Sequence, residues 1–371
     1  MNRRIIIIVV LAICINCAFA QNTVNRVIDL PINRASLIHE YAQIFPDNTQ
    51  FSIALIEDSI TRYYGIIKQK GMVEPIENSN KVFEIGSISK VLTATLLANA
   101  ILRNEIGLED DINKFYDFPF SDSVRINFLS LANHTSGLPA VTSNLDVESF
   151  LESKRKDVLK NPFKEYDVMD LEYYLKDEMK LGNALPKEYN YSNFAAGLLG
   201  YTLGILHGSS YGNILSDEIF KKYGMSNSYT DSRTVDVELV KGLDYKGNPV
   251  DNWDWDSDVF LGAGGVLSTA EDLSKFAKAQ FDPTNTELAI TRIPTFTVND
   301  QMKIALGWHI IKNGNNFPLY WHNGGTGGYS SSIVLDVKAK KGVVILSNVS
   351  TFHPNMGNID SLCFQLMEII R

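Results

Sequence analysis

The chain has 371 residues, of which 45% are hydrophobic and 21% are charged, and its formal net charge is −9 at pH 7. This composition predicts a soluble globular protein, and no stretch after the first twenty residues approaches the length of a membrane span. The acidic balance and the lack of a basic cluster argue against nucleic acid as a partner.

The first twenty residues have the layout of a secretory signal peptide. Met1–Arg4 is a short basic start, Ile5–Ile13 is an unbroken apolar run, and Ala18–Ala20 is an A-x-A type cleavage site. The apolar run is too short for a spanning helix. We therefore expect export to the periplasm or the medium without stable membrane insertion. A lipoprotein anchor on Cys14 or Cys17 is the second interpretation, and a retained membrane anchor is the third.

The remaining part, 21–371, is predicted to form one domain. Its length of about 350 residues is enough for a large core, in one domain or in two closely packed subdomains. Cys363 is the only cysteine after the leader. No intramolecular disulfide is therefore possible, and the fold must depend on its core.

Strands and helices are predicted from alternating or helical spacing of apolar residues between turn residues. In chain order they are strands Phe51–Glu57 and Ile60–Lys68, helices Ser87–Asn104, Asn193–His207 and Ala270–Gln280, strands Ser330–Val337 and Gly342–Val349, and a closing helix Asn358–Ile370. The stretch of roughly 105–260 mixes short helical patterns with loops. The order indicates an α+β fold, in which both chain ends build one sheet and a helical region is inserted between them. A cleft is expected at the junction.

The first motif is Gly86-Ser87-Ile88-Ser89-Lys90. Positions i and i+3 share a helix face, so Lys90 is expected beside the Ser87 hydroxyl. A serine hydroxyl becomes a strong nucleophile only when a base takes its proton. The N–H groups at the helix start would favour an alkoxide. Ser-x-x-Lys alone has little specificity, since an N-cap serine followed by a surface lysine gives the same pattern.

The second motif is Tyr191-Ser192-Asn193, at the start of a predicted helix. A tyrosine oxygen near a lysine and a serine can carry protons as general base and then as general acid. The asparagine amide can bind a substrate carbonyl. Taken alone, a buried tyrosine before a helix explains the motif as well.

The third motif is His322-Asn323-Gly324-Gly325, which leads into the strand from Ser330. On an edge strand it could line a cleft, where glycines let a substrate backbone approach closely. The Gly325 N–H could pair with the Ser87 N–H as an oxyanion hole, in which one donor contributes about 10²–10³ in rate. A lone histidine is more often structural.

The order of the three motifs is far more specific than any one of them. Together they resemble the penicillin-recognising serine hydrolases, in the branch of class C β-lactamases, DD-peptidases and esterases. Further similar stretches, in the right order over roughly 51–349, are Leu108–Phe115, Asn133–Pro139, Gly264–Asp272 and Leu306–Trp308.

The resemblance implies a β-lactamase/transpeptidase-like fold, with an antiparallel sheet flanked by helices and an all-helical region. Ser87 would attack a carbonyl with help from Lys90 and Tyr191, expel an amine or alcohol, and release the acyl group to water. Asn193 would help to hold the substrate. No metal or organic cofactor is expected. Whether Lys90 or Tyr191 takes the Ser87 proton is left open, because coupled groups share their titration.

His322 is a departure from the family pattern. Class C β-lactamases usually carry lysine there, and histidine is more similar to the DD-peptidases and esterases of the branch. A neutral imidazole holds a substrate carboxylate less well than a lysine does. The candidate substrates are therefore β-lactams, D-amino-acid peptides and small esters, and the fold alone cannot choose among them.

The sequence is also compatible with two alternative functions. Gly208-Ser209-Ser210-Tyr211-Gly212 matches the G-x-S-x-G elbow of α/β-hydrolases, with Ser210 as nucleophile. That elbow needs a preceding strand, whereas Asn193–His207 is predicted to be helical. The other alternative is a penicillin-binding sensor that is acylated slowly and does not turn over. The oligomeric state is left open.

Two further patterns, a histidine that could be a catalytic base and three acids that could bind calcium, are not predicted to be functional. His134 lies in a loop that resembles a structural element of the family. Asp254, Asp256 and Asp258 lack the glycine that an EF-hand loop requires after its third acid.

Overall fold

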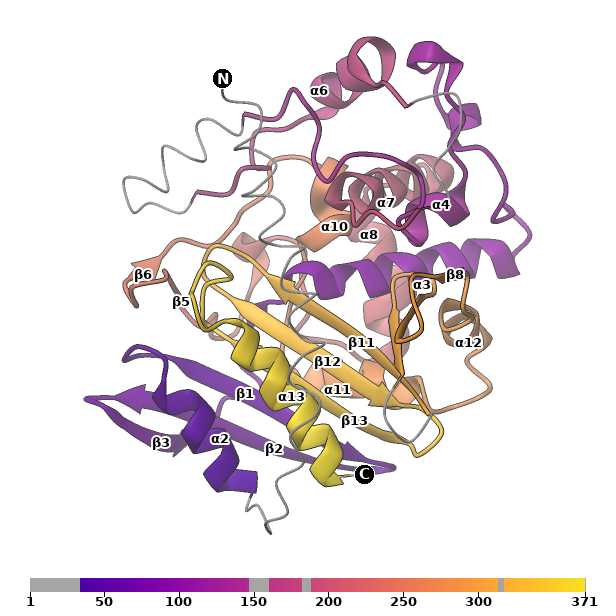
Figure 1. The fold of residues 1–371 in the computed structure, drawn as a ribbon. Coiled ribbons are helices and arrows are strands. Elements are labelled where there is room, and N and C mark those ends of the chain that lie inside the picture. The colour runs from indigo at the N-terminus through magenta and orange to yellow at the C-terminus, as the bar shows by residue number, and fades with distance from the viewer. Residues whose placement is uncertain (1–33, 147–159, 182–187, 313–316, 371) are drawn as a thin grey trace.

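The computed structural model describes residues 34–146, 160–181, 188–312 and 317–370. The predicted signal peptide lies outside these residues. A nine-stranded sheet runs through the molecule in the order β3-β2-β1-β13-β12-β11-β10-β9-β8, and every neighbouring pair is antiparallel (Figure 1). The bounds of these strands are β1 Gln50–Glu57, β2 Ile60–Gln69, β3 Met72–Ile76, β8 Phe296–Thr297, β9 Met302–Ile304, β10 His309–Lys312, β11 Pro318–Gly325, β12 Ser330–Asp336 and β13 Lys341–Ser347.

Helices cover both faces of the sheet, so its central strands are buried on both sides. Helices α2 (Arg34–Gln43) and α13 (Gly357–Ile370) lie on one face, and α11 (Ala270–Ala279) lies on the other (Figure 1). Successive residues of β12 pack into two different hydrophobic cores: Ile333 packs with the helical region, and Val334 packs with α13. This alternation follows from the period of two in a strand.

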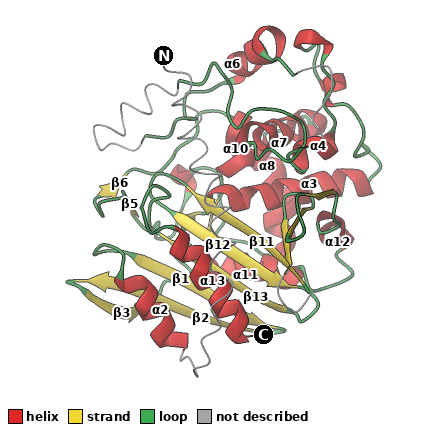
Figure 2. Cartoon of the chain, viewed as in Figure 1, coloured by secondary structure: helices red, strands yellow, loops and turns green. Residues whose placement is uncertain are grey.

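The helical region stands beside one end of the sheet (Figure 2). Its helices are α3 Ser89–Leu102, α4 Phe128–Ala132, α6 Val168–Tyr173, α7 Asn193–His207, α8 Tyr211–Leu215, α9 Lys221–Tyr223, α10 Leu261–Gly264 and α12 Thr286–Thr291. Two small sheets accompany it: β4 (Phe83–Glu84) with β7 (Leu267–Ser268), and β5 (Gly242–Leu243) with β6 (Pro249–Val250). No helix among the described ranges is long and apolar enough to span a membrane.

The predicted α+β class is confirmed, and most predicted elements lie within one or two residues of those observed. The helix expected from Ser87 differs. A 3-10 turn over Gly86–Ile88 comes first, and α3 begins at Ser89. Gly86 has a φ of +51°, a left-handed conformation that an α-helix cannot contain, so the chain bends before the helix begins.

The strand that carries His322 is not at an edge of the sheet, which is where the third motif could have lined a cleft. This strand is β11, and it lies inside the sheet between β10 and β12. Three strands that we did not predict, β8, β9 and β10, extend the sheet beyond it. His322 is consequently fully buried rather than placed at an open edge.

Candidate active site

Ser87 lies in a sharp connection between a strand and a helix. The preceding strand β4 is held against β7, and the Ile85 N–H donates to the Val266 carbonyl at 3.0 Å. The chain then passes through the left-handed Gly86 into the 3-10 turn that carries Ser87. Ser87 is half-buried at the end of α3 that meets the sheet. Neighbours on both sides therefore fix the position of its hydroxyl.

Lys90 joins three parts of the site. Its Nζ is 2.9 Å from Ser87 Oγ, 2.8 Å from Asn193 Oδ1 and 2.7 Å from the carbonyl oxygen of Ala263. The side chain is 3% exposed. An ammonium group has three N–H donors, and these three acceptors match them. After losing one proton, the same amine would accept a hydrogen bond from the Ser87 hydroxyl. The geometry is that of a serine with an adjacent proton carrier.

Tyr191 lies next to Lys90, two residues before α7 begins. Ser192 is the N-cap of α7, and its hydroxyl accepts from the Ala195 N–H at 2.8 Å and donates to the Pro139 carbonyl at 2.6 Å. The Tyr191 ring centroid is 4.9 Å from Lys90 Nζ. The cap thus places both Tyr191 and Asn193 next to the lysine.

Three buried histidines surround the Tyr191 ring. The distances between ring centroids are 4.6 Å to His134, 6.3 Å to His309 and 6.3 Å to His322. Burial is the largest cause that lowers the pKa of each, to about 4 for His309 and well below the usual 6.5 for the other two. Proximity to Lys90 lowers all three pKa values further. All three rings are therefore neutral at pH 7.

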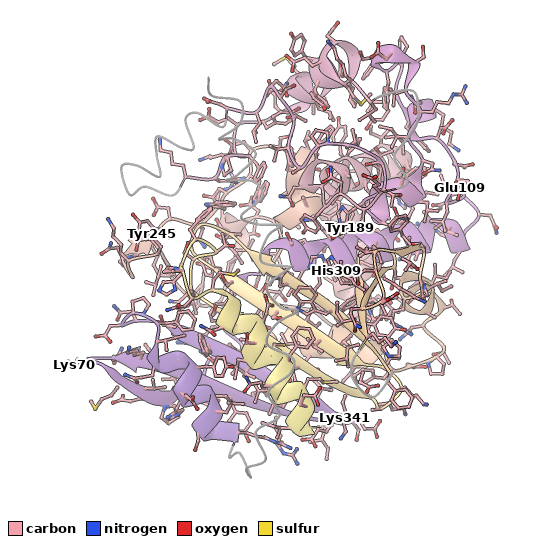
Figure 3. All side chains as sticks on the ribbon, viewed as in Figure 1. Lys70, Glu109, Tyr189, Tyr245, His309 and Lys341 are labelled. Carbon is pink, nitrogen blue, oxygen red and sulfur yellow. The ribbon has the colours of Figure 1, made fainter. Side chains whose placement is uncertain are left out.

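His134 and His309 were not predicted as part of the site. His134 Nδ1 accepts from the Ser192 N–H at 3.2 Å, so this ring helps to position the start of α7. His309 shares a 2.8 Å hydrogen bond with the Tyr189 hydroxyl, and Figure 3 shows the two side chains next to each other between the sheet and the helical region. The only sequence signal for His309 was its place directly after the Leu306–Trp308 match.

His322 is a neutral group with a defined tautomer. Its Nδ1 donates to its neighbour's carbonyl oxygen, Asn323 O, at 2.6 Å. Because a carbonyl oxygen only accepts, Nδ1 carries the proton and Nε2 is an acceptor. Nε2 is buried and has no hydrogen-bond partner among the described residues. Its ring centroid is 5.1 Å from that of His309.

The Asn323 side chain points away from the site. Neighbouring strand residues face opposite sides of the sheet, and the Asn323 Nδ2 donates to Asp360 Oδ2 of α13 at 2.8 Å. The expected contact of this side chain with substrate therefore does not fit the geometry. Asn323 instead ties β11 to α13.

Gly324 and Gly325 let β11 pass directly against the turn that carries Ser87. A Cβ atom on Gly324 would collide with the Ile85 carbonyl and lie 2.8 Å from the Ser87 nitrogen. A Cβ atom on Gly86 would collide with the Gly325 nitrogen. The backbones of the Ser87 turn and the Gly325 strand are thus in direct contact.

The structure contradicts the α/β-hydrolase alternative. Ser210 follows a helix, α7, and not a strand. Its hydroxyl caps α8 by accepting from the Asn213 N–H at 3.2 Å. The strained strand-to-helix elbow that exposes a nucleophile is absent at this position.

No group of three or more His, Cys, Asp or Glu side chains in the described part of the chain is arranged to hold a metal ion. The Asp254–Asp258 loop instead has internal partners. The Ser232 hydroxyl bonds to Asp254, and Asp258 accepts from the Tyr211 N–H.

Comparisons with known proteins find matches over most of the chain. The family model described as "Beta-lactamase" matches residues 60–360. The chain is 24% identical to a beta-lactamase of Pseudomonas fluorescens, over 71% of this chain and 70% of the relative. It is 24% identical to penicillin-binding protein 4* of Bacillus subtilis, over 73% and 61%, and 24% identical to the D-alanyl-D-alanine-carboxypeptidase/endopeptidase AmpH of Escherichia coli K12, over 70% and 66%. The chain thus spans about two thirds of the length of these relatives.

Solved structures show the same fold. The octameric penicillin-binding protein homologue from Pyrococcus abyssi has a TM-score of 0.73 at 22% identity, with 90% of this chain and 76% of that chain covered. The class C beta lactamase from Rhodobacter sphaeroides has a TM-score of 0.71 at 20% identity, with 91% and 99% covered.

Proposed function

The chain belongs to the beta-lactamase family, and we propose that it is a serine hydrolase that cleaves an amide or ester bond through an acyl-enzyme on Ser87. The contact that carries this proposal is the 2.9 Å distance between Lys90 Nζ and Ser87 Oγ, inside a buried cluster that also holds Tyr191 and Asn193. A serine next to a lysine that can give up and take back a proton is the minimum that acyl transfer requires.

The proposed reaction has two steps. In acylation, Ser87 Oγ attacks the substrate carbonyl while its proton passes to Lys90 or Tyr191. The bond to the leaving amine or alcohol breaks, and that group takes the proton. In deacylation, water attacks the Ser87 ester and regenerates the hydroxyl. The N–H groups of Ser87 and Gly325 would stabilise the negative oxygen, and each such donor is worth about 10²–10³ in rate.

We further propose that substrates without a carboxylate next to the third motif are preferred. The reason is His322, whose ring is buried and neutral, with an unprotonated Nε2. Such a nitrogen accepts a hydrogen bond from a hydroxyl or N–H but gives no positive charge to a carboxylate. Small esters and capped peptides therefore fit this position better than substrates with a free carboxylate do.

Export through the leader remains part of the proposal. It is supported by the basic, apolar and A-x-A segments within residues 1–20. Sequencing the amino terminus of the secreted protein tests it, and a mature chain that begins at Gln21 is the expected result.

The test of the hydrolase proposal is a pair of serine variants. Ser87→Ala should lower the hydrolysis of a penicillin, a D-alanyl-D-alanine peptide or a p-nitrophenyl ester, whichever the wild type cleaves, by about 10³-fold or more while the fold is retained. Ser210→Ala is the matched control, since Ser210 only caps α8, and it should keep wild-type activity. Hydrolysis that survives in Ser87→Ala would reject Ser87 as the nucleophile.

A further inference from the structure

Glu84 is a buried carboxyl group that has no positively charged partner in the described part of the chain. It lies on β4, three residues before Ser87, and is 4% exposed. No lysine, arginine or histidine of the described ranges forms an ion pair with it. Burying an acidic group in this way opposes folding unless other contacts compensate, so its retention here needs a reason.

One oxygen of Glu84 holds the segment that follows β6. Its Oε1 accepts from the Trp253 N–H at 2.7 Å and from Asn252 Nδ2 at 3.0 Å. The same Asn252 amide donates to the Tyr329 hydroxyl at 2.8 Å. The Glu84 carboxyl therefore fixes the beginning of the segment 252–264 against the strand that leads to Ser87.

The other end of the same segment contacts the catalytic lysine. The Ala263 carbonyl, in α10, accepts from Lys90 Nζ at 2.7 Å. Just beyond it, the Val266 N–H donates to the Ser89 hydroxyl at 3.1 Å. The segment 252–264 is thus attached at one end to Glu84 and at the other end to the residues around Ser87.

The second oxygen of Glu84 faces the hydroxyl of Thr326, the residue that follows β11. Glu84 Oε2 and Thr326 Oγ1 are both buried without a hydrogen-bond partner among the described residues. Burial raises the pKa of Glu84 to about 7, with Asp254 raising it further, while Thr326, Trp253 and Asn252 lower it. A carboxyl that gains its proton on Oε2 still accepts through Oε1, so both hydrogen bonds to 252–253 persist in either form.

We propose that Glu84 is a positioning residue of the active site: through Asn252 and Trp253 it fixes the segment 252–264, so that the Ala263 carbonyl stays in place to orient Lys90 toward Ser87. Glu84 itself contacts no reacting atom. Its contribution to the orientation of Lys90 rests on the proposed function, but the attachment of the segment does not.

Two variants distinguish the positioning role of the Glu84 carboxyl from the effect of its side-chain volume. Glu84→Gln keeps an acceptor oxygen for Trp253 and Asn252, whereas Glu84→Ala removes it. Glu287→Gln is the matched control, because Glu287 is also 4% exposed but pairs with Lys222, away from the segment 252–264. Asn252→Ala removes one of the two donors to Glu84, and Asn252 is more exposed than Glu84. This variant replaces Glu84→Ala in the test if Glu84→Ala does not fold.

The first readout is hydrogen–deuterium exchange of peptides over 250–264, which does not depend on activity. In Glu84→Ala the Trp253 amide should exchange about ten- to a hundredfold faster, as expected for the loss of a hydrogen bond to a buried carboxyl. Glu84→Gln and Glu287→Gln should protect this amide as the wild type does, and Asn252→Ala should fall between. Unchanged protection in Glu84→Ala or Asn252→Ala would overturn the proposed attachment.

The second readout is the rate constant for acylation of Ser87 at a saturating concentration of an activated ester. We expect a loss of about tenfold or more in Glu84→Ala and partial rescue in Glu84→Gln, since misplacement of a catalytic group by a fraction of an ångström has effects of this size. Equal loss in both variants, or none in Glu84→Ala, would overturn the positioning role. If the wild type is not acylated at Ser87, the proposed function itself fails, and the exchange readout still decides the attachment.

Discussion

At the residue scale, the proposed role of His322 is to determine which charges the site accepts. A lysine at this position would present a charge that the neutral, buried ring does not have. Its Nδ1 proton is already used by the Asn323 carbonyl. The ring therefore brings no positive charge to the site, and the proposed preference for uncharged groups follows from that.

His322→Lys should therefore shift the preference toward substrates with a free carboxylate. For a peptide that ends in D-alanine, compared with the same peptide capped as an amide, the ratio of kcat/KM values should rise by about tenfold or more, which is typical of one new charge-assisted hydrogen bond. His322→Asn, which stays neutral, is the control and should leave the ratio near that of the wild type. A wild type that already favours the free acid strongly would contradict the proposed role of the neutral ring.

Some residues of the candidate site were identifiable from the sequence and others were not. Ser87, Lys90, Tyr191 and Asn193 stand in short motifs whose helical spacing brings them together, and the structure places them within contact of one another. His309 comes from a separate strand with no motif of its own. The direction of Asn323 could have been anticipated, because strand alternation puts His322 and Gly324 on one face and the residue between them on the other.

At the scale of elements, the contact between β11 and the Ser87 turn depends on glycines. Gly86 has a left-handed backbone, and the space where its side chain would lie is filled by the Gly325 nitrogen. Gly208, at the end of α7, has a similar φ of +59° but nothing within 4 Å of its missing Cβ. Both positions require a left-handed backbone, but another segment of backbone comes close to the missing side chain only at the first of these two glycines.

Gly86→Ala should therefore be much more harmful than Gly208→Ala. We expect Gly208→Ala to lower the free energy of unfolding by about 1–2 kcal/mol, the cost of a left-handed alanine, with acylation of Ser87 unchanged. Gly86→Ala should lower it by more than that and should also slow acylation, because β11 must move away from the turn. Urea denaturation and acylation kinetics of the two variants measure this. Equal effects in both would mean that the close approach has no role.

Long elements with clear ends were predicted best. Helix α7 matches its predicted bounds because Ser192 caps it and the left-handed Gly208 ends it, and both signals are local. Strands β8 and β9 have only two and three residues, which is too few for a periodic pattern. The interior position of β11 could not be predicted, since it depends on these strands extending the sheet beyond it.

At the scale of the whole molecule, Glu84 links stability to pH. Its pKa is about 7 in the folded protein, against 4.5 as its ordinary value, because the group is buried. Between these pH values the folded protein binds a proton that the unfolded chain has released. The stabilisation is therefore complete below about pH 4.5 and is lost as the pH rises through about 7. Asp360, whose pKa burial raises to about 6, acts in the same direction.

Glu84→Gln removes only the Glu84 part of this dependence. The free energy of unfolding of the variant, relative to the wild type, should increase by roughly 3 kcal/mol between pH 4.5 and pH 8. Asp360 and the buried histidines contribute equally to both proteins and cancel in the difference. Urea denaturation at several pH values gives this difference directly. A difference that stays constant over the whole range would contradict the raised pKa of Glu84.

At the candidate site, the Ser87–Lys90 motif meets Tyr191 and Asn193 of the second motif and the glycines of the third, and these three motifs come from distant parts of the chain. Time-resolved mass spectrometry of the intact protein with a penicillin and with a phosphonate probe, alongside Ser87→Ala, tests directly whether Ser87 is the nucleophile. We expect a covalent adduct with at least one of the two compounds that maps to Ser87 and is absent in the variant. Decay of a penicillin adduct while the drug is consumed would indicate hydrolysis, and a persistent one would favour a sensor that is acylated without turnover. An adduct on another residue, or no adduct with either compound on a folded wild-type protein, would contradict the acyl-Ser87 mechanism.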